Sequence, residues 1–301
     1  MATEETTTST TDLPPGIRQV IIGRTGTATS VQEEEIVLRG LQPNEKINLE
    51  INIDDDSPNF RGVMQLLFLV LEKKKNIQFF DMNNDCKNID NYVRCLEFFI
   101  QFILDNNETT HFRHYSKSEN HESQMNLTRS RQLAAAIRSN SHGQIETFTF
   151  WPGLHDTFTT LEGFQLVLDS LLETGVQVLN LEYVINNNGV QQEINLASFS
   201  TNTALQKLHL FVDFDLYTGI DWITFCDAIK IKQRLESLEI CSDQFDDQEV
   251  VQVMLLQVIG LLRENNSLTQ VQVSGSDDDI NDINDDSQKT INNLLAINRD
   301  W

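Results

Sequence analysis

The chain has few cysteines and few basic residues for its length, and each shortage argues against a class of protein. Only 4 of its 301 residues are cysteine, and none forms a C-x-x-C pair, which disfavours a disulfide-stapled secreted scaffold. Lysine and arginine number 22 against 45 aspartates and glutamates, giving a formal net charge of -23. Because such a chain repels phosphates, we expect no binding to nucleic acid or to an anionic membrane.

Long hydrophobic runs are absent as well. The longest nearly pure run, Val63–Leu71, is interrupted by Gln65 and is far shorter than the roughly 18–20 residues that span a bilayer. The first ten residues lack the basic and apolar regions of a signal peptide. We therefore expect a cytoplasmic protein, and the sequence leaves a nuclear location open.

Motifs for catalysis or cofactor binding are also missing from the sequence. There is no phosphate-binding loop, dinucleotide fingerprint, G-x-S-x-G or H-E-x-x-H, and the pair Gly23 and Gly26 is too short a loop for phosphate. A cysteine nucleophile would need a neighbouring histidine, and the spacing gives no sign of one. We therefore expect no enzyme and no cofactor, and we interpret the cysteines as core residues. They are Cys86, Cys95, Cys226 and Cys241.

An acidic segment at 277–286 resembles part of a calcium-binding loop. Three of its residues match the first three ligand positions of an EF-hand. However, Asp282 stands where the loop needs glycine, and Gln288 stands where it needs glutamate. We interpret the segment as a solvated loop, with weak calcium binding left open.

Four of the six histidines fall in the region 110–142, which is also basic. His111 and His114 lie three residues apart on a predicted strand, hence on opposite faces, so we expect no metal site with His121 and His142. The region holds five basic and two acidic residues, a net of +3, whereas 213–301 holds 6 basic and 18 acidic, a net of -12. This asymmetry fits either ordinary surface variation or a partner that is basic where it meets the C-terminal half.

Three lines of sequence near the C-terminus repeat one pattern. Thr203–Leu210, Gln233–Ile240 and Asn266–Val273 each read L-x-x-L-x-L, or its Val/Ile equivalent, and their leading leucines lie 30 and 33 residues apart. A period of this size indicates a repeat protein.

Strand-like and helix-like runs alternate upstream of these lines at the same spacing. Further strands are predicted at Lys46–Ile53, Ile77–Met82, Thr110–Tyr115, Ile145–Phe150 and Val178–Tyr183. Helices are predicted at Phe60–Lys73, Asp90–Leu104, Leu127–Arg138, Leu161–Glu173, Leu196–Phe199, Asp221–Lys232, Gln248–Glu264 and Ser287–Asn298. Strands that alternate with helices favour right-handed β-α units and a parallel sheet, so the predicted fold class is α/β.

The chain divides into three predicted parts. Residues 1–15 are rich in threonine and glutamate and should form a disordered tail. Residues 16–45, with a short strand at Ile17–Ile22 and a helix at Val31–Arg39, are predicted to cap the array. Residues 46–301 form a predicted array of about eight repeats, none of which can bury its apolar face alone.

The L-x-x-L-x-L lines, with a full helix in each unit of about thirty residues, resemble leucine-rich repeats of the ribonuclease-inhibitor-like subfamily. The resemblance covers 46–301 and implies an open curved solenoid, or horseshoe, with a parallel sheet on the concave side and helices on the convex side. It also implies protein binding. The asparagine that this family places after the strand is replaced here by Asp213, Asp243 and Ser276. The spacing fits poorly at 110, where Phe112 and Tyr115 interrupt it.

We predict a non-enzymatic scaffold that binds another protein, with no nucleic acid or membrane partner, through the concave face. A substrate-recognition or regulatory subunit is the alternative, and a calcium-dependent protein or an enzyme is a third reading. Acidic repeats favour a partner with a basic surface, and such binding should weaken with added salt. The predicted binding residues are Phe79, Glu146, Thr149, Asn180, Glu182, Lys207, His209, Glu236, Glu239, Gln270 and Gln272.

Overall fold

Strands and helices alternate from one end of the described chain to the other. The structure is a computed structural model, and it describes residues 17–23, 28–42, 45–54, 60–72, 77–116, 125–140, 145–151, 158, 160–183, 197–212, 222–232, 234–241, 248–274 and 285–299. The strands are β1 (Ile17–Ile22), β2 (Lys46–Ile53), β3 (Ile77–Asn84), β4 (His111–Tyr115), β5 (Thr147–Trp151), β6 (Val178–Tyr183), β7 (Lys207–Val212), β8 (Ser237–Cys241) and β9 (Gln270–Ser274). The helices are α1 (Ala28–Gly40), α2 (Phe60–Glu72), α3 (Ile89–Asp105), α4 (Leu127–Ser139), α5 (Leu161–Glu173), α6 (Ala197–Thr201), α7 (Trp222–Lys230), α8 (Gln248–Glu264) and α9 (Asp285–Arg299).

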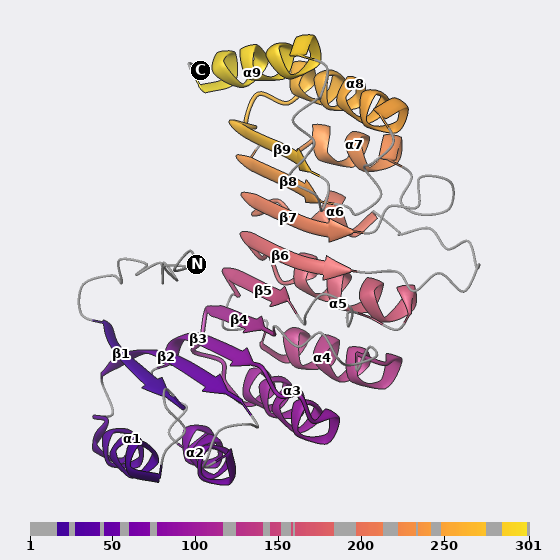
Figure 1. The fold of residues 1–301 in the computed structure, drawn as a ribbon. Coiled ribbons are helices and arrows are strands. Elements are labelled where there is room, and N and C mark those ends of the chain that lie inside the picture. The colour runs from indigo at the N-terminus through magenta and orange to yellow at the C-terminus, as the bar shows by residue number, and fades with distance from the viewer. Residues whose placement is uncertain are drawn as a thin grey trace, which may run out of the picture.

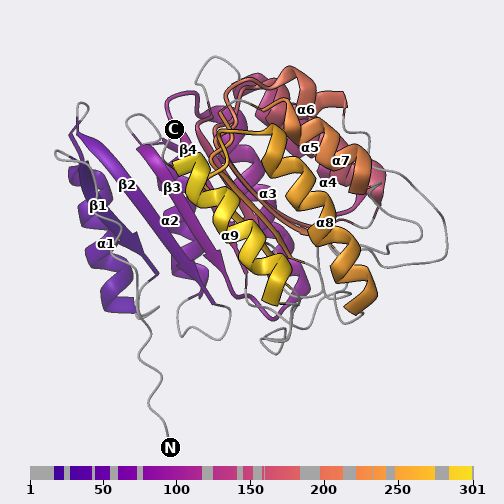
Figure 2. The ribbon, with the colours of Figure 1, turned by 90° about the horizontal axis from the view of Figure 1, so that it is seen from above.

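The described strands form one open parallel sheet in the order β1 to β9, so each strand pairs with the next one along the chain. The helices gather on one side of this sheet, and the row of units bends around its other face (Figures 1 and 2). The predicted α/β solenoid, with strands on the concave side and helices on the convex side, is confirmed. Within the described helices, no segment is both long and apolar enough to cross a membrane.

The alternation of side chains along the strands explains this layering. In β2 every second residue is buried, so isoleucine and leucine face the helices while polar residues face the concave side. The helices present a wide apolar face to the sheet, and α3 alone buries eight side chains. The centre of the core is aromatic: the rings of Phe80 and Phe102 stack with centroids 3.9 Å apart, and Phe99 packs 5.9 Å from Phe80. Each unit thus covers its apolar surface only by stacking on its neighbours.

Polar side chains fix where three of the helices begin. Asn88 accepts hydrogen bonds from the backbone N–H groups of Asp90 and Asn91 at the start of α3. Asn126 caps α4 and Thr160 caps α5 in the same manner. These caps satisfy N–H groups that the helices themselves leave unpaired.

The unit at β4, where the repeat spacing fits poorly, is regular in the structure. Phe112 and His114 take the inward positions and Tyr115 lies on the concave side. The imidazole of His114 is fully buried, 5.1 Å from the ring of Phe99 and 5.1 Å from that of Phe150. No hydrogen bond from the described residues reaches either ring nitrogen, and burial lowers the pKa of His114 to about 3. His114 therefore replaces an aliphatic core residue as a neutral ring.

Buried asparagines join successive units at the turns that precede the strands. The side-chain amide of Asn265 donates to the carbonyl oxygens of Ile229, at 3.1 Å, and Lys232, at 3.0 Å, in the preceding unit. Its Oδ1 accepts from the backbone N–H groups of Ser267, at 2.9 Å, and Leu268, at 3.0 Å, in its own turn. One side chain thus holds its own turn in shape and also binds that turn to the unit before it.

The same position is polar in other units. The amides of Asn140, Asn202 and Asn298 also donate to carbonyl oxygens of the preceding unit. Lys232 replaces asparagine in one unit, where its ammonium donates to the carbonyl of Asn202 and burial lowers its pKa. Asn106 accepts from two N–H groups of its own turn, as Asn202 does. We call this series (Asn106, Asn140, Asn202, Lys232, Asn265 and Asn298) the amide ladder.

The amide ladder lies at a position that the resemblance did not indicate. The resemblance to leucine-rich repeats points to the residues after the strands, whereas the ladder residues Asn202, Lys232 and Asn265 stand three residues before the leading leucines 205, 235 and 268. Asp213, Asp243 and Ser276, together with the tail 1–15 and most of the acidic segment 277–286, lie outside the described residues.

The N-terminal segment 16–45 continues the array. β1 pairs in parallel with β2 over six residues, and α1 lies beside α2. Gly23 follows β1 with a φ of 79°, and a Cβ at that position would lie 1.9 Å from the carbonyl oxygen of Asn52. Only glycine fits there, because the backbone approaches β2 too closely for a side chain.

We predict that Asn265→Ala destabilises the protein by about 2–4 kcal/mol, because it removes two hydrogen bonds to carbonyls of the preceding unit and leaves the N–H groups of Ser267 and Leu268 without their acceptor. Asn266→Ala is the matched control, since Asn266 is exposed and should change stability by less than about 0.5 kcal/mol. Urea unfolding measures both variants. Equal effects of the two substitutions would contradict the role given to the amide ladder.

Candidate functional site

The concave face carries rows of side chains that the sheet register aligns across neighbouring strands. Because parallel strands in register place equivalent residues side by side, each row runs along the whole array. The central row reads Glu50, Asp81, Arg113, Thr149, Asn180, His209, Glu239 and Gln272. Side-chain hydrogen bonds join parts of this face: Asn180 donates to Thr149 at 2.9 Å, and Asn83 donates to Asn52 at 2.8 Å.

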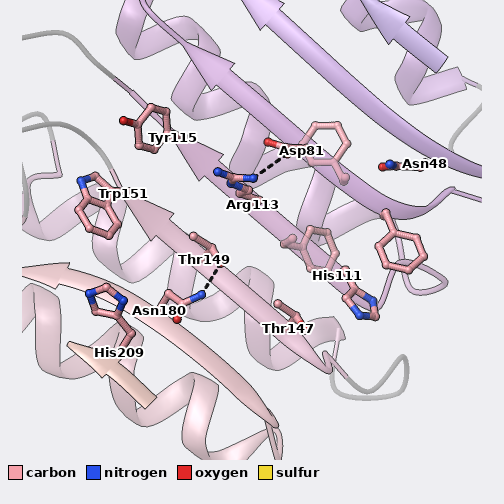
Figure 3. Close-up of a pocket in the computed structure, with 13 residues that line it drawn as sticks. Asn48, Asp81, His111, Arg113, Tyr115, Thr147, Thr149, Trp151, Asn180 and His209 are labelled. Atoms are coloured by element: carbon pink, nitrogen blue, oxygen red, sulfur yellow. Dashed lines mark hydrogen bonds and ion pairs between the residues drawn. The ribbon is translucent and has the colours of Figure 1, made fainter. Parts of the chain in front are cut away.

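A hollow of about 500 Å³ opens in the middle of this face (Figure 3). It arises because β5 contributes short threonines, Thr147 and Thr149, where the neighbouring strand β4 carries His111 and Arg113. Its lining residues come from β2 to β7. They are Asn48, Phe79, Phe80, Asp81, His111, Phe112, Arg113, Tyr115, Thr147, Thr149, Trp151, Asn180 and His209.

Aromatic rings and imidazoles form the walls of the hollow. At one end the ring of Phe79 lies 4.2 Å from that of His111, tilted by 31°. Across the threonines, Trp151 meets the ring of His209 edge-on at 5.5 Å and lies 6.4 Å from Tyr115. Large, rigid aromatic side chains of this kind are the usual anchors of protein interfaces.

A charged pair lines the hollow beside the threonines. The guanidinium of Arg113 contacts Oδ2 of Asp81 at 3.4 Å and lies 6.0 Å from the centroid of Tyr115 (Figure 3). Burial raises the pKa of Asp81 to about 6, Arg113 opposes this rise, and the nearby charge of Glu50 adds to it. The carboxyl of Asp81 therefore gains or loses its proton close to neutral pH.

Each imidazole of the hollow faces a carboxylate on the side away from its aromatic neighbour. His111 Nε2 lies 3.9 Å from Glu146, and His209 Nδ1 lies 3.2 Å from Glu239. Burial lowers the pKa of both histidines, and the facing carboxylates oppose this lowering. Because burial dominates, both rings are neutral at neutral pH.

The predicted binding residues fall into three groups in the structure. Phe79, Thr149, Asn180 and His209 line the hollow. Glu146 and Glu236 stand just before β5 and β8, at the edge of the concave face, and the side chain of Glu182 lies outside the described residues. The remainder take outward positions on β7 to β9, and they are Lys207, Glu239, Gln270 and Gln272.

Aromatic residues are more common on the concave face than the sequence analysis predicted. Phe79 was the main aromatic expected there, whereas Tyr115 and Trp151 share the face with it. Both were missed because they end their strands: the predicted fifth strand stopped at Phe150, and Tyr115 interrupted the leucine spacing. Asp81, His111 and Arg113 were also missed, and a strict two-residue alternation from Phe79 and from Tyr115 would have found all three.

The basic region 110–142 divides between the two faces. On the convex side, Arg129, Arg131 and Arg138 of α4 form ion pairs with glutamates of the neighbouring helices at 3.6, 3.0 and 3.0 Å. His111 and His114 point to opposite faces of β4, and His121 and His142 lie outside the described residues. Among the described residues, no group of three or more histidines, cysteines or carboxylates is placed to hold a metal ion.

Three of the cysteines are core residues, as predicted. Cys86, Cys95 and Cys226 are buried and unoxidised, and burial raises the pKa of the Cys226 thiol to about 12. Such a thiol is not a nucleophile at neutral pH. The side chain of Cys241 lies outside the described residues.

Comparison with known protein families and with curated proteins identifies no relative of this chain. No model of a known protein family matches the chain, and no curated protein matches it. The resemblance to leucine-rich repeats therefore stays a prediction that rests on the repeat lines themselves.

We expect opposite shifts of the Asp81 pKa when its two charged neighbours are neutralised. Arg113→Met should raise this pKa above about 6, because it removes the cation that stabilises the carboxylate. Glu50→Gln should lower it towards the ordinary value, because it removes a repelling charge. A carbon-13 NMR titration of the aspartate carboxyl groups measures both. Unchanged values in both variants would show that the two charges do not act on Asp81.

Proposed function

We propose that this protein is a non-enzymatic protein-protein interaction scaffold that binds its partner through the concave face. The aromatic hollow carries the proposal, because Phe79, Tyr115 and Trp151 line it on a face whose central row is mainly polar. An interface core of aromatic residues within a polar rim is the usual anatomy of a protein-binding surface.

The shape of the face favours a macromolecule over a small ligand. Outward side chains continue on both sides of the hollow, from Gln19 on β1 to Gln272 on β9. Small-ligand pockets bury most of their ligand within a concave cavity, whereas this hollow is one depression in a long open surface. A partner that lies along the strands would insert one side chain there.

The alternative role, as a substrate-recognition or regulatory subunit of a larger complex, would use the same surface. The repeat lines support membership of the leucine-rich repeat class, whose concave faces bind proteins, and we propose that membership together with a cytoplasmic location. The excess of 45 acidic over 22 basic residues supports a partner with a basic surface, with binding that weakens as salt is added.

A tryptophan placed in the hollow tests the proposed function. Thr149→Trp fills the space between Arg113 and Asn180, and we expect it to weaken partner binding at least about tenfold, because it blocks the anchor position. The measurement is quantitative affinity purification from the native cell, followed by affinity determination for the captured protein.

Thr128→Trp on α4 is the matched control, because it adds the same ring to an exposed position on the convex side. Thermal unfolding of both variants verifies that they are folded. The proposal fails if partners are retained by Thr149→Trp, or if both variants lose them equally.

A further inference from the structure

The two ends of the hollow are built alike. Each end has an aromatic ring packed on an imidazole, and a carboxylate on the far side of that imidazole. The first triplet is Phe79, His111 and Glu146, and the second triplet is Trp151, His209 and Glu239. The ring distances are those of packing, and the imidazole lies within hydrogen-bond distance of the carboxylate in the second triplet, at 3.2 Å, but beyond it in the first, at 3.9 Å.

In the part of the chain that the structure describes, no lysine or arginine forms an ion pair with the carboxylates of the two triplets. Among the described residues, the partner of Glu146 is His111 and the partner of Glu239 is His209. Because burial keeps both imidazoles neutral at neutral pH, neither carboxylate is neutralised. Both glutamates also remain accessible, with 43% and 32% of their side-chain surfaces exposed.

Acidic groups outnumber basic groups around the hollow. Glu50 and Asp81 lie next to one another on the central row, in addition to the two glutamates of the triplets. Arg113 is the basic residue among those that line the hollow, and Lys207 lies outside the lining, two residues before His209. Arg129, Arg131 and Arg138 are engaged on the convex side and do not offset this charge. The hollow therefore presents a negative field together with aromatic faces, which both attract cations.

Arg113 is an example, within the protein itself, of a cationic side chain that packs on this surface. Its guanidinium rests against the carboxylate of Asp81 and lies over the ring of Tyr115, yet 54% of its side chain is exposed. A guanidinium can thus occupy a position between a carboxylate and an aromatic ring on this face.

We propose that the hollow binds the cationic side chain, an arginine or a lysine, of a basic segment of a partner protein. At either end of the hollow the aromatic ring of the triplet contacts its aliphatic stem, and the carboxylate of the same triplet, Glu146 or Glu239, neutralises its charged head. This inference rests on the proposed function, and it adds the chemistry of the side chain that enters the anchor position.

A short peptide with one arginine tests the proposal without knowledge of the partner. The probe is acetyl-Gly-Ser-Arg-Ser-Gly-amide, and the neutral control has citrulline in place of arginine, which keeps the shape and removes the charge. The full-length protein is labelled with nitrogen-15 in the indoles of its three tryptophans, and Trp151→Phe identifies the signal of Trp151. At low salt and pH 7.5, the arginine peptide should shift the Trp151 signal saturably, and the citrulline peptide should not.

Charge variants locate the contact. Glu239→Gln should weaken binding of the arginine peptide by at least about threefold, the size of a half-exposed cation contact. Glu264→Gln is the matched control on the convex side, because it removes the same charge from a glutamate near Lys230. Lowering the pH to 5 should also weaken binding, because Asp81 loses its charge below about 6.

Several outcomes would overturn the proposal. Equal binding of the arginine and citrulline peptides would show that charge is not recognised. Tighter binding of the same peptide with phenylalanine or aspartate in the central position would assign the hollow to an aromatic or an acidic side chain. No shift of Trp151 by the arginine peptide, combined with partner loss in Thr149→Trp, would remove this inference and leave the proposed function standing. A Trp151 shift with full partner retention by Thr149→Trp would contradict the proposed function instead.

Discussion

Buried side-chain amides between successive units are the interaction on which the rest of this structure depends. A strand and a helix of about thirty residues cannot form a core alone, so each unit relies on its neighbours. Apolar stacking supplies most of the attraction but little direction, whereas the amide ladder has strict geometry. Asn265, for example, binds two carbonyls of one unit and two N–H groups of the next. Where it is present, the ladder thereby helps to fix how one unit lies against the next.

The concave face follows from that regular placement. Because the strands are in register, equivalent residues align across the sheet. Polar side chains on neighbouring strands can therefore form hydrogen bonds with one another. A change in side-chain size along one row then becomes a feature of the surface. Thr147 and Thr149 of β5, set beside His111 and Arg113 of β4, produce the hollow without any irregularity of the backbone. The candidate binding surface thus arises from a difference in side-chain size on a regular backbone.

The repeat period made most of the fold predictable, while the side-chain details were less so. Helices such as α5 and α8 have the predicted bounds, because their apolar residues recur at helical spacing. The amide ladder was missed because the resemblance directed attention to the other end of the strands. The unit at β4 fitted the spacing poorly because Phe112 and Tyr115 interrupt it, whereas the structure shows a regular unit in which His114, a polar residue by type, serves as a core ring. Trp151 was missed for a different reason: it stands one residue beyond the apolar alternation that defined its strand.

Hydrogen exchange at the ladder turns tests the central claim most directly. The backbone N–H groups of Thr109, Leu205 and Leu268 precede their strands and donate to the buried side-chain oxygens of Asn106, Asn202 and Asn265. If the amide ladder holds the units together, these three N–H groups exchange as slowly as those of the paired strands. Exchange at the rate of exposed loops would contradict the account, because the units would then be held by the backbone pairing of the sheet and by apolar stacking without the ladder.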